Sequence, residues 1–164
     1  MKDYLRPDFC FDGVDKISFE ILKNNDIKYI LLDLDNTLIN YRKELKPSII
    51  EWVKKAKEEG FQIYILSNSN KLEKVTKAAE ALEIQFINSA RKPLKKGFYK
   101  AIEKFKIEPQ HTAMVGDQLF TDVIGGNRMD MFSIYVEPID TKEAWYTSWK
   151  RPIEAWLLKK YKNV

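Results

Sequence analysis

The sequence predicts an α/β protein with a Rossmann-like three-layer arrangement, in which helices cover both faces of a five-stranded, mostly parallel sheet. The first observation is that short apolar runs alternate with longer stretches whose apolar residues recur at helical spacing. The second is that polar turn residues follow these runs. Strands that alternate with helices at this pace form parallel sheets. The expected strands cover residues 29–35, 61–66, 84–87, 112–116 and 132–136.

The helices expected between these strands have recognisable ends. Pro47 suits the first turn of a helix over residues 48–59, and Gly60 suits its termination. A second helix is expected over residues 71–82, and a third carries Phe98, Ala101, Ile102 and Phe105 on its inner face. A short helix at 120–124 is expected to be closed by Gly125-Gly126. Residues 1–28 form a polar lead-in with at most a short helix.

Length and composition narrow the class of protein. A chain of 164 residues fits a single domain spanning residues 1–164, and 45% hydrophobic with 32% charged residues is typical of a globular protein. No apolar run is long enough to span a bilayer, and the first residues lack an apolar signal core, so we expect a cytoplasmic protein. The single Cys10 excludes an intramolecular disulfide and a cysteine-based zinc cluster.

Polar side chains gather where the expected strands end. Asp33 and Asp35 follow the first strand, Ser67 and Asn68 the second, and Lys92 the third, while the fourth leads to Asp117 and Asp122. The carboxyl ends of parallel strands meet at one edge of the sheet, which is where such folds bind ligands. Turn and cap chemistry is the alternative for each residue alone, and Ser67 in particular suits the N-cap of the next helix. Four strand ends with this chemistry indicate a site.

The residue types at this edge suit a magnesium ion and a phosphoryl group. Mg²⁺ prefers carboxylate oxygens, and Lys92 with the Ser67 hydroxyl can hold phosphoryl oxygens. A carboxylate can act as a nucleophile, and a second carboxyl two residues further on can act as acid and base.

These stretches resemble the haloacid dehalogenase-like (HAD) phosphatases over nearly the whole chain. The matching motifs are Asp33-Leu34-Asp35-Asn36-Thr37-Leu38, the strand ending in Ser67, Lys92-Pro93, and Gly116-Asp117-Gln118-Leu119-Phe120-Thr121-Asp122. The resemblance implies a HAD-like fold, with Asp33 as nucleophile and Asp35 as general acid and base. It also implies a Mg²⁺ site formed by Asp33, the main-chain carbonyl of Asp35, and Asp117. Ser67, Asn68 and Lys92 would bind phosphate. Asp122 would stabilise the metal site or the lysine without itself coordinating the metal.

The spacing of the motifs leaves no room for a cap domain over the site. The chain most resembles the capless YqeG-type group through Leu5-Arg6-Pro7, Ala90-Arg91-Lys92-Pro93 and the stretch from Gly116 to Arg128. Relatives of that group dephosphorylate phosphatidylglycerophosphate, which implies a lipid phosphate substrate. Gly126-Asn127-Arg128 either shapes the substrate entrance or forms a turn.

The C-terminal tail carries the excess of positive charge. Residues 142–164 hold six Lys/Arg and two acids, and the remaining residues balance. Ile153, Trp156, Leu157 and Tyr161 share a helical face, with Trp145 and Trp149 upstream and Lys159, Lys160 and Lys162 near the end. This tail either contacts the inner face of an anionic membrane peripherally or packs on the domain. The charge gives no strong signal for nucleic acid.

Two other classes of protein share part of this pattern. A phospho-acceptor receiver domain has a similar architecture, but it carries adjacent acids after its first strand and its phospho-accepting Asp after a later one. A HAD-fold binding partner in a larger assembly is the second alternative, although all four catalytic positions are filled.

Overall fold

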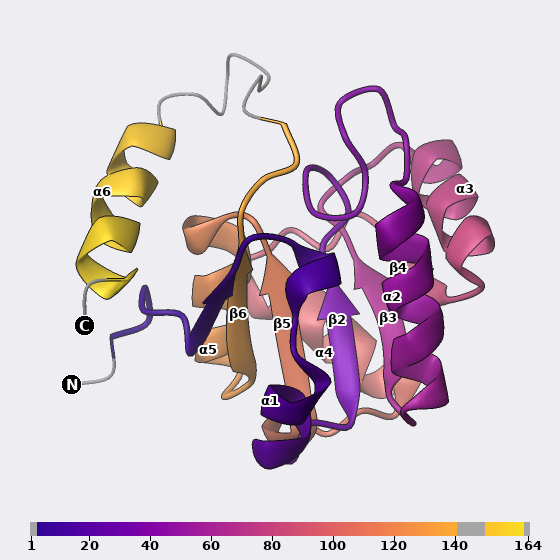
Figure 1. Ribbon diagram of the computed structural model, residues 1–164, viewed down its shortest axis with the longest axis horizontal. Coiled ribbons are helices and arrows are strands. Elements are labelled where there is room, and N and C mark those ends of the chain that lie inside the picture. The colour runs from indigo at the N-terminus through magenta and orange to yellow at the C-terminus, as the bar shows by residue number, and fades with distance from the viewer. Residues whose placement is uncertain (1–2, 141–149, 163–164) are drawn as a thin grey trace.

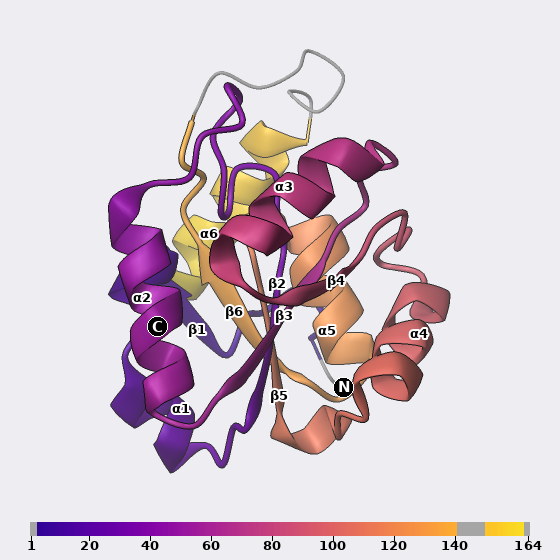
Figure 2. The same ribbon diagram turned by 90° about the vertical axis from the view of Figure 1, so that its right-hand side faces the viewer.

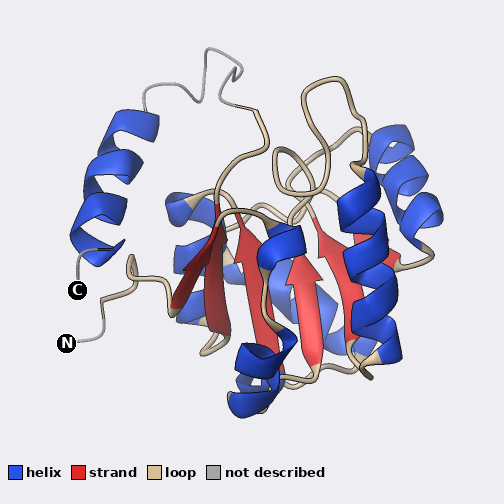
Figure 3. Cartoon of the chain, viewed as in Figure 1, coloured by secondary structure: helices blue, strands red, loops and turns tan. Residues whose placement is uncertain are grey.

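A six-stranded parallel sheet forms the centre of the computed structural model, which describes residues 3–140 and 150–162 (Figure 1). The strand order is β1-β6-β5-β2-β3-β4, and every pairing is parallel. All five expected strands are present, as Figure 3 shows in red. The strands are β1 (Phe9–Phe11), β2 (Tyr29–Leu32), β3 (Gln62–Leu66), β4 (Gln85–Ile87), β5 (Thr112–Gly116) and β6 (Phe132–Val136).

The sixth strand, β1, corrects the predicted count of five. It lies in the stretch expected to be a polar lead-in and pairs along β6, with Phe9 opposite Ile134 and Phe11 opposite Val136. The Phe9 ring stacks on Phe11 at 6.1 Å between centroids. Three residues at a sheet edge are too few to show a periodic pattern, so tertiary pairing determines this strand.

Two layers of helices cover the sheet, on opposite sides of it in Figure 2. Alternate residues of β2 face the two layers: Ile30 and Leu32 pack with α1 to α3, whereas Leu31 packs with α4. All three side chains are fully buried, which explains the uninterrupted apolar run. The helices are α1 (Phe19–Asn24), α2 (Pro47–Glu58), α3 (Leu72–Leu82), α4 (Lys95–Phe105), α5 (Ile124–Arg128) and α6 (Arg151–Lys162).

The two consecutive glycines do not close a helix as predicted. Leu119–Val123 forms one wide π-helical turn that continues directly into α5, and both glycines lie inside α5. A Cβ on Gly125 would lie 2.6 Å from the Phe98 ring, and one on Gly126 would lie 2.9 Å from the Met114 side chain. Glycine is therefore required here for close packing of α5 against α4 and β5. The turn, one of the two alternatives for Gly126-Asn127-Arg128, is wrong.

The C-terminal helix α6 packs against the end of the molecule that carries β6 (Figure 1). Leu157 and Leu158 are buried against Leu119, Val123 and Tyr135. The predicted apolar face is partly wrong, because Ile153 is 46% exposed and Trp156 is 67% exposed. Trp145 and Trp149 lie outside the described residues.

The rim of the sheet carries no inserted cap domain in the part of the chain that the structure describes. Only the loop 33–46 separates β2 from α2, and only α3, β4 and their loops separate Ser67 from Lys92. Among the described helices, none is long and apolar enough to cross a membrane.

Candidate active site

The predicted site residues lie at the carboxyl ends of the strands, and the side chains of Asp33, Lys92, Asp117 and Asp122 form one cluster there. Asp33 follows β2, Ser67 follows β3 and Asp117 follows β5, and these three strands are neighbours in the sheet. Lys92 arrives from the loop after β4, and Asp122 from the π-helical turn after β5. The fold therefore brings these residues to one edge of the sheet, as the sequence predicts.

Lys92 is the buried cation at the centre of this cluster. Its ammonium Nζ donates to Asp33 Oδ1 at 2.9 Å and to Asp122 Oδ1 at 2.7 Å, and its side chain is 1% exposed. Burial alone lowers the pKa of Lys92, but the carboxylates of Asp122 and Asp33 outweigh it and raise the pKa above its usual value. Lys92 is thus held charged beside the candidate nucleophile.

Asn68 positions the main chain of Lys92. Its Oδ1 accepts from the Lys92 amide at 2.6 Å, and its Nδ2 donates to the Lys92 carbonyl at 3.0 Å. Both ends of the Asn68 amide are engaged in this contact, which fixes the loop that carries the lysine.

Three buried carboxylates form an acidic cluster, defined here as Asp33, Asp117 and Asp122. One oxygen from each lies within 4.8 Å of the others. Burial and the charges of Asp33 and Asp122 raise the pKa of Asp117 well above its usual value. Burial also raises the pKa of Asp122 to about 7, although Lys92 opposes the shift. Three buried carboxylate oxygens this close together repel one another when ionised, so this donor set fits a divalent cation.

Gly116 allows the acidic cluster to be this compact. A Cβ at this position would lie 2.0 Å from Asp122 Oδ2, so any other residue would displace that carboxylate. The second oxygen of Asp122 also accepts from the Gln118 amide at 3.2 Å. Asp122 therefore has both oxygens engaged, consistent with the supporting position that the sequence predicts.

Asp35 and Ser67 have contrasting environments. The Asp35 side chain is 52% exposed, and its Oδ1 accepts from Lys74 Nζ at 2.6 Å. Ser67 is fully buried, and its Oγ accepts from the Ser69 amide at 3.1 Å. The N-cap alternative for Ser67 is wrong, because α3 begins at Leu72 after Lys71 and has no side-chain cap.

Two further residues contact the acidic cluster, and neither was selected from the sequence. Thr37 Oγ1 donates to Asp117 Oδ1 at 3.1 Å, and Thr37 already stands within the first motif. Arg151, the first residue of α6, donates from Nη2 to Asp117 Oδ2 at 2.6 Å and from Nη1 to the Asp117 carbonyl at 2.7 Å. Nothing in the sequence around Arg151 indicates this contact across the fold.

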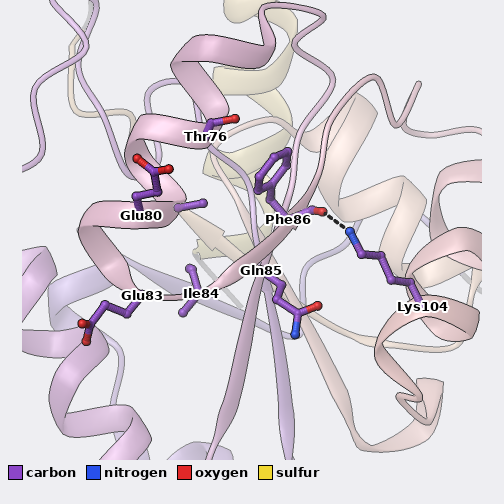
Figure 4. A pocket seen from close by; sticks show the side chains of 8 residues that line it. Thr76, Glu80, Glu83, Ile84, Gln85, Phe86 and Lys104 are labelled. Atoms are coloured by element: carbon purple, nitrogen blue, oxygen red, sulfur yellow. Dashed lines mark hydrogen bonds between the residues drawn. The ribbon is translucent and has the colours of Figure 1, made fainter.

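A separate pocket of about 430 Å³ lies beside the edge strand β4, between α3 and α4 (Figure 4). Its lining includes Glu80, Gln85 and Phe86, and Lys104 donates from Nζ to the Phe86 carbonyl at 3.0 Å. None of the acidic-cluster residues lines it. We therefore assign no chemistry to this pocket.

A buried lysine between carboxylates, at the carboxyl ends of a parallel sheet, has the charges that suit a phosphoryl group and a cation. Residues 40–130 match the family model for haloacid dehalogenase-like hydrolases. The chain is 36% identical to "Probable phosphatase YqeG" of Bacillus subtilis, over 99% of this chain and 95% of that protein. The chain belongs to the haloacid dehalogenase-like hydrolases, as a phosphatase of the YqeG-type group.

Two further similarities are more distant. The chain is 29% identical to phosphatidylglycerophosphate phosphatase 1, chloroplastic/mitochondrial, of Arabidopsis thaliana, over 98% of this chain and 49% of that protein. It thus spans about half of that relative's length. A HAD-like family hydrolase of known structure from Porphyromonas gingivalis superposes with a TM-score of 0.57 at 12% identity, covering 77% of this chain and 98% of that one. This last similarity supports the fold.

Proposed function

We propose that the protein is a Mg²⁺-dependent phosphomonoesterase that works through an aspartyl-phosphate and acts on a lipid phosphate, phosphatidylglycerophosphate. The observation that carries the mechanism is the placement of Asp33, which lies beside a buried lysine and within an acidic cluster that fits a divalent cation. The lipid substrate is supported by the similarity to the Arabidopsis thaliana phosphatase and by the uncapped rim.

In this proposal Asp33 is the nucleophile. Its carboxylate oxygen attacks the phosphorus, the bond to the alcohol oxygen breaks, and the Asp35 carboxyl gives its proton to the departing alkoxide. Asp35 then takes a proton from water, which attacks the phosphorus, releases phosphate and regenerates the Asp33 carboxylate. Lys92 and the Ser67 hydroxyl hold the phosphoryl oxygens.

A divalent cation held by Asp33, Asp117 and the Asp35 carbonyl would shield the nucleophile from the negative substrate and polarise a phosphoryl oxygen. Asp122 keeps Lys92 charged and oriented in this scheme. Without a cation, the carboxylates of the acidic cluster would repel a phosphate dianion.

The test is phosphate release from phosphatidylglycerophosphate in mixed micelles, with Mg²⁺ or with EDTA, beside a panel of soluble phosphomonoesters. The proposal expects magnesium-dependent turnover with a strong preference for the lipid. Turnover restricted to soluble esters would reject the lipid substrate and keep the mechanism. If nothing is hydrolysed, the protein would instead be a HAD-fold binding partner.

Peripheral contact of the cytoplasmic protein with an anionic membrane through α6 is the second part of the proposal. Ile153 and Trp156 are exposed on this helix, and Lys159 and Lys160 are exposed near its end. A double substitution of Ile153 and Trp156 by serine should weaken binding to vesicles containing phosphatidylglycerol. Tyr99→Ser, which removes an aromatic residue that is 56% exposed from α4, is the control. Equal binding by the double variant and the wild type would reject this contact.

A further inference from the structure

A groove of about 770 Å³ lies next to the candidate active site, between the loop after β2 and the helices α2 and α3. Figure 1 and Figure 2 both show this loop beside α3 at the carboxyl-end rim. The groove is connected to the site through Lys74, which lines it and donates to Asp35 at 2.6 Å. The groove therefore adjoins Asp35, the candidate general acid, so the departing alcohol of a substrate at Asp33 is the part that would face it.

The groove combines an apolar floor with a basic rim. Ile50 is 40% exposed and Leu72 is 55% exposed, although both are large apolar side chains lining a concave surface. Five basic side chains line the groove, against two acidic ones: Arg42, Lys43, Lys71, Lys74 and Lys77 against Glu44 and Glu73. Exposed apolar residues ringed by charge mark a binding surface, and the volume is that of a ligand site.

We propose that this groove binds the alcohol part of an amphiphilic substrate, with a second anionic group on the basic rim and the proximal hydrocarbon on Ile50 and Leu72. The inference rests on the proposed function, because it assigns the groove to the same substrate whose phosphate is hydrolysed at Asp33. A phospholipid that carries a phosphomonoester, a phosphodiester and acyl chains has these features in this order.

Charge and polarity select this occupant over a soluble sugar phosphate. A sugar presents hydroxyl groups along its length, which need hydrogen-bonding partners when they are buried. The floor of the groove offers Ile39, Leu45, Ile50 and Leu72, which are apolar. The net positive rim also suits an anionic group better than a neutral one.

The experiment compares three substrates that differ by one feature at a time. Phosphatidylglycerophosphate has acyl chains and a second phosphate, its deacylated counterpart keeps only the second phosphate, and glycerol 3-phosphate has neither. Leu72→Ser should lower kcat/KM for the intact lipid about tenfold, because the exposed leucine would no longer cover the hydrocarbon, and leave both soluble substrates unchanged. Lys77→Glu should lower kcat/KM for the lipid and its deacylated counterpart and spare glycerol 3-phosphate.

Matched controls exclude general effects on micelle binding. Tyr99→Ser removes another large side chain that is 56% exposed, on α4 and outside the groove lining. Lys100→Glu makes the same charge change as Lys77→Glu on an exposed face of α4. Equal losses in the groove variants and their controls, or equal losses on all three substrates, would overturn the groove assignment. A wild-type protein that hydrolyses only glycerol 3-phosphate would instead reject the lipid substrate itself.

Discussion

The buried ammonium of Lys92 should make a large contribution to the stability of the metal-free protein. Lys92→Met keeps a similar side-chain length and removes the charge, which leaves Asp33 and Asp122 facing each other without their shared partner. The three side chains are 1%, 10% and 1% exposed for Lys92, Asp33 and Asp122, so water cannot replace the lost contact. Removing one partner of such a buried pair costs about 3–5 kcal/mol, a large share of the about 5–15 kcal/mol that typically stabilises a domain.

Equilibrium urea denaturation in EDTA at pH 8 measures this cost as a shift of the midpoint at constant slope. Lys74→Met is the matched control, because it breaks an ion pair whose carboxylate, Asp35, is 52% exposed. Exposed pairs contribute about 0–1 kcal/mol. If Lys92→Met destabilises the protein no more than Lys74→Met does, then the acidic cluster does not depend on Lys92 for charge compensation.

Three further predictions concern the acidic cluster. Asp33→Asn should keep the fold, measured by circular dichroism, and lose nearly all phosphate release, because the uncatalysed reaction is extremely slow; substantial residual turnover would remove Asp33 as nucleophile. In EDTA, the free energy of unfolding should fall by a few kcal/mol as pH rises from about 5 to about 8. The reason is that burial raises the pKa of Asp122 to about 7, so that below this pH the folded state keeps a proton which the unfolded state has lost. Saturating Mg²⁺ should remove that fall, and a stability that rises over this range in EDTA would contradict the reasoning. Arg151→Ala should lower the Mg²⁺ concentration needed for half-maximal activity severalfold, because the guanidinium competes for Asp117; a higher requirement would show that Arg151 instead orients Asp117 for the cation.

The central part of the fold was predictable because its local and global signals agree. The run from Tyr29 to Leu32 is apolar at every position since β2 is buried on both faces, and charged residues follow where the strand ends. The candidate site was predictable because it depends on the same strands. Each of its predicted residues stands directly after a strand, or on the loop or π-helical turn that follows one, so the sheet topology brings them to one edge.

The edges of the fold were not predictable for physical reasons that differ from place to place. The strand β1 depends on its pairing with β6, which no local pattern expresses. Gly125 and Gly126 favour a turn when only the chain is considered, but contacts with Phe98 and Met114 require them inside a helix. The buried face of α6 includes Glu154, which is 2% exposed, and an apolar stripe cannot identify a buried acid.

Glu154 is buried because it has partners at the active site. Its Oε1 accepts from the Phe120 amide at 3.3 Å, and its Oε2 lies 3.4 Å from Nη1 of Arg151, the residue that contacts Asp117. The apolar contacts of Leu157 and Leu158 reach Leu119 and Val123 in the same segment. The helix α6 therefore holds the segment that carries Asp117 and Asp122 through both polar and apolar contacts. When all three carboxyls are ionised, Lys92 and Arg151 supply two positive charges against three negative ones, so the cluster then has a net negative charge before any substrate binds. A phosphate dianion would add to that charge, which is why the binding of a divalent cation and of the substrate should favour each other at this site.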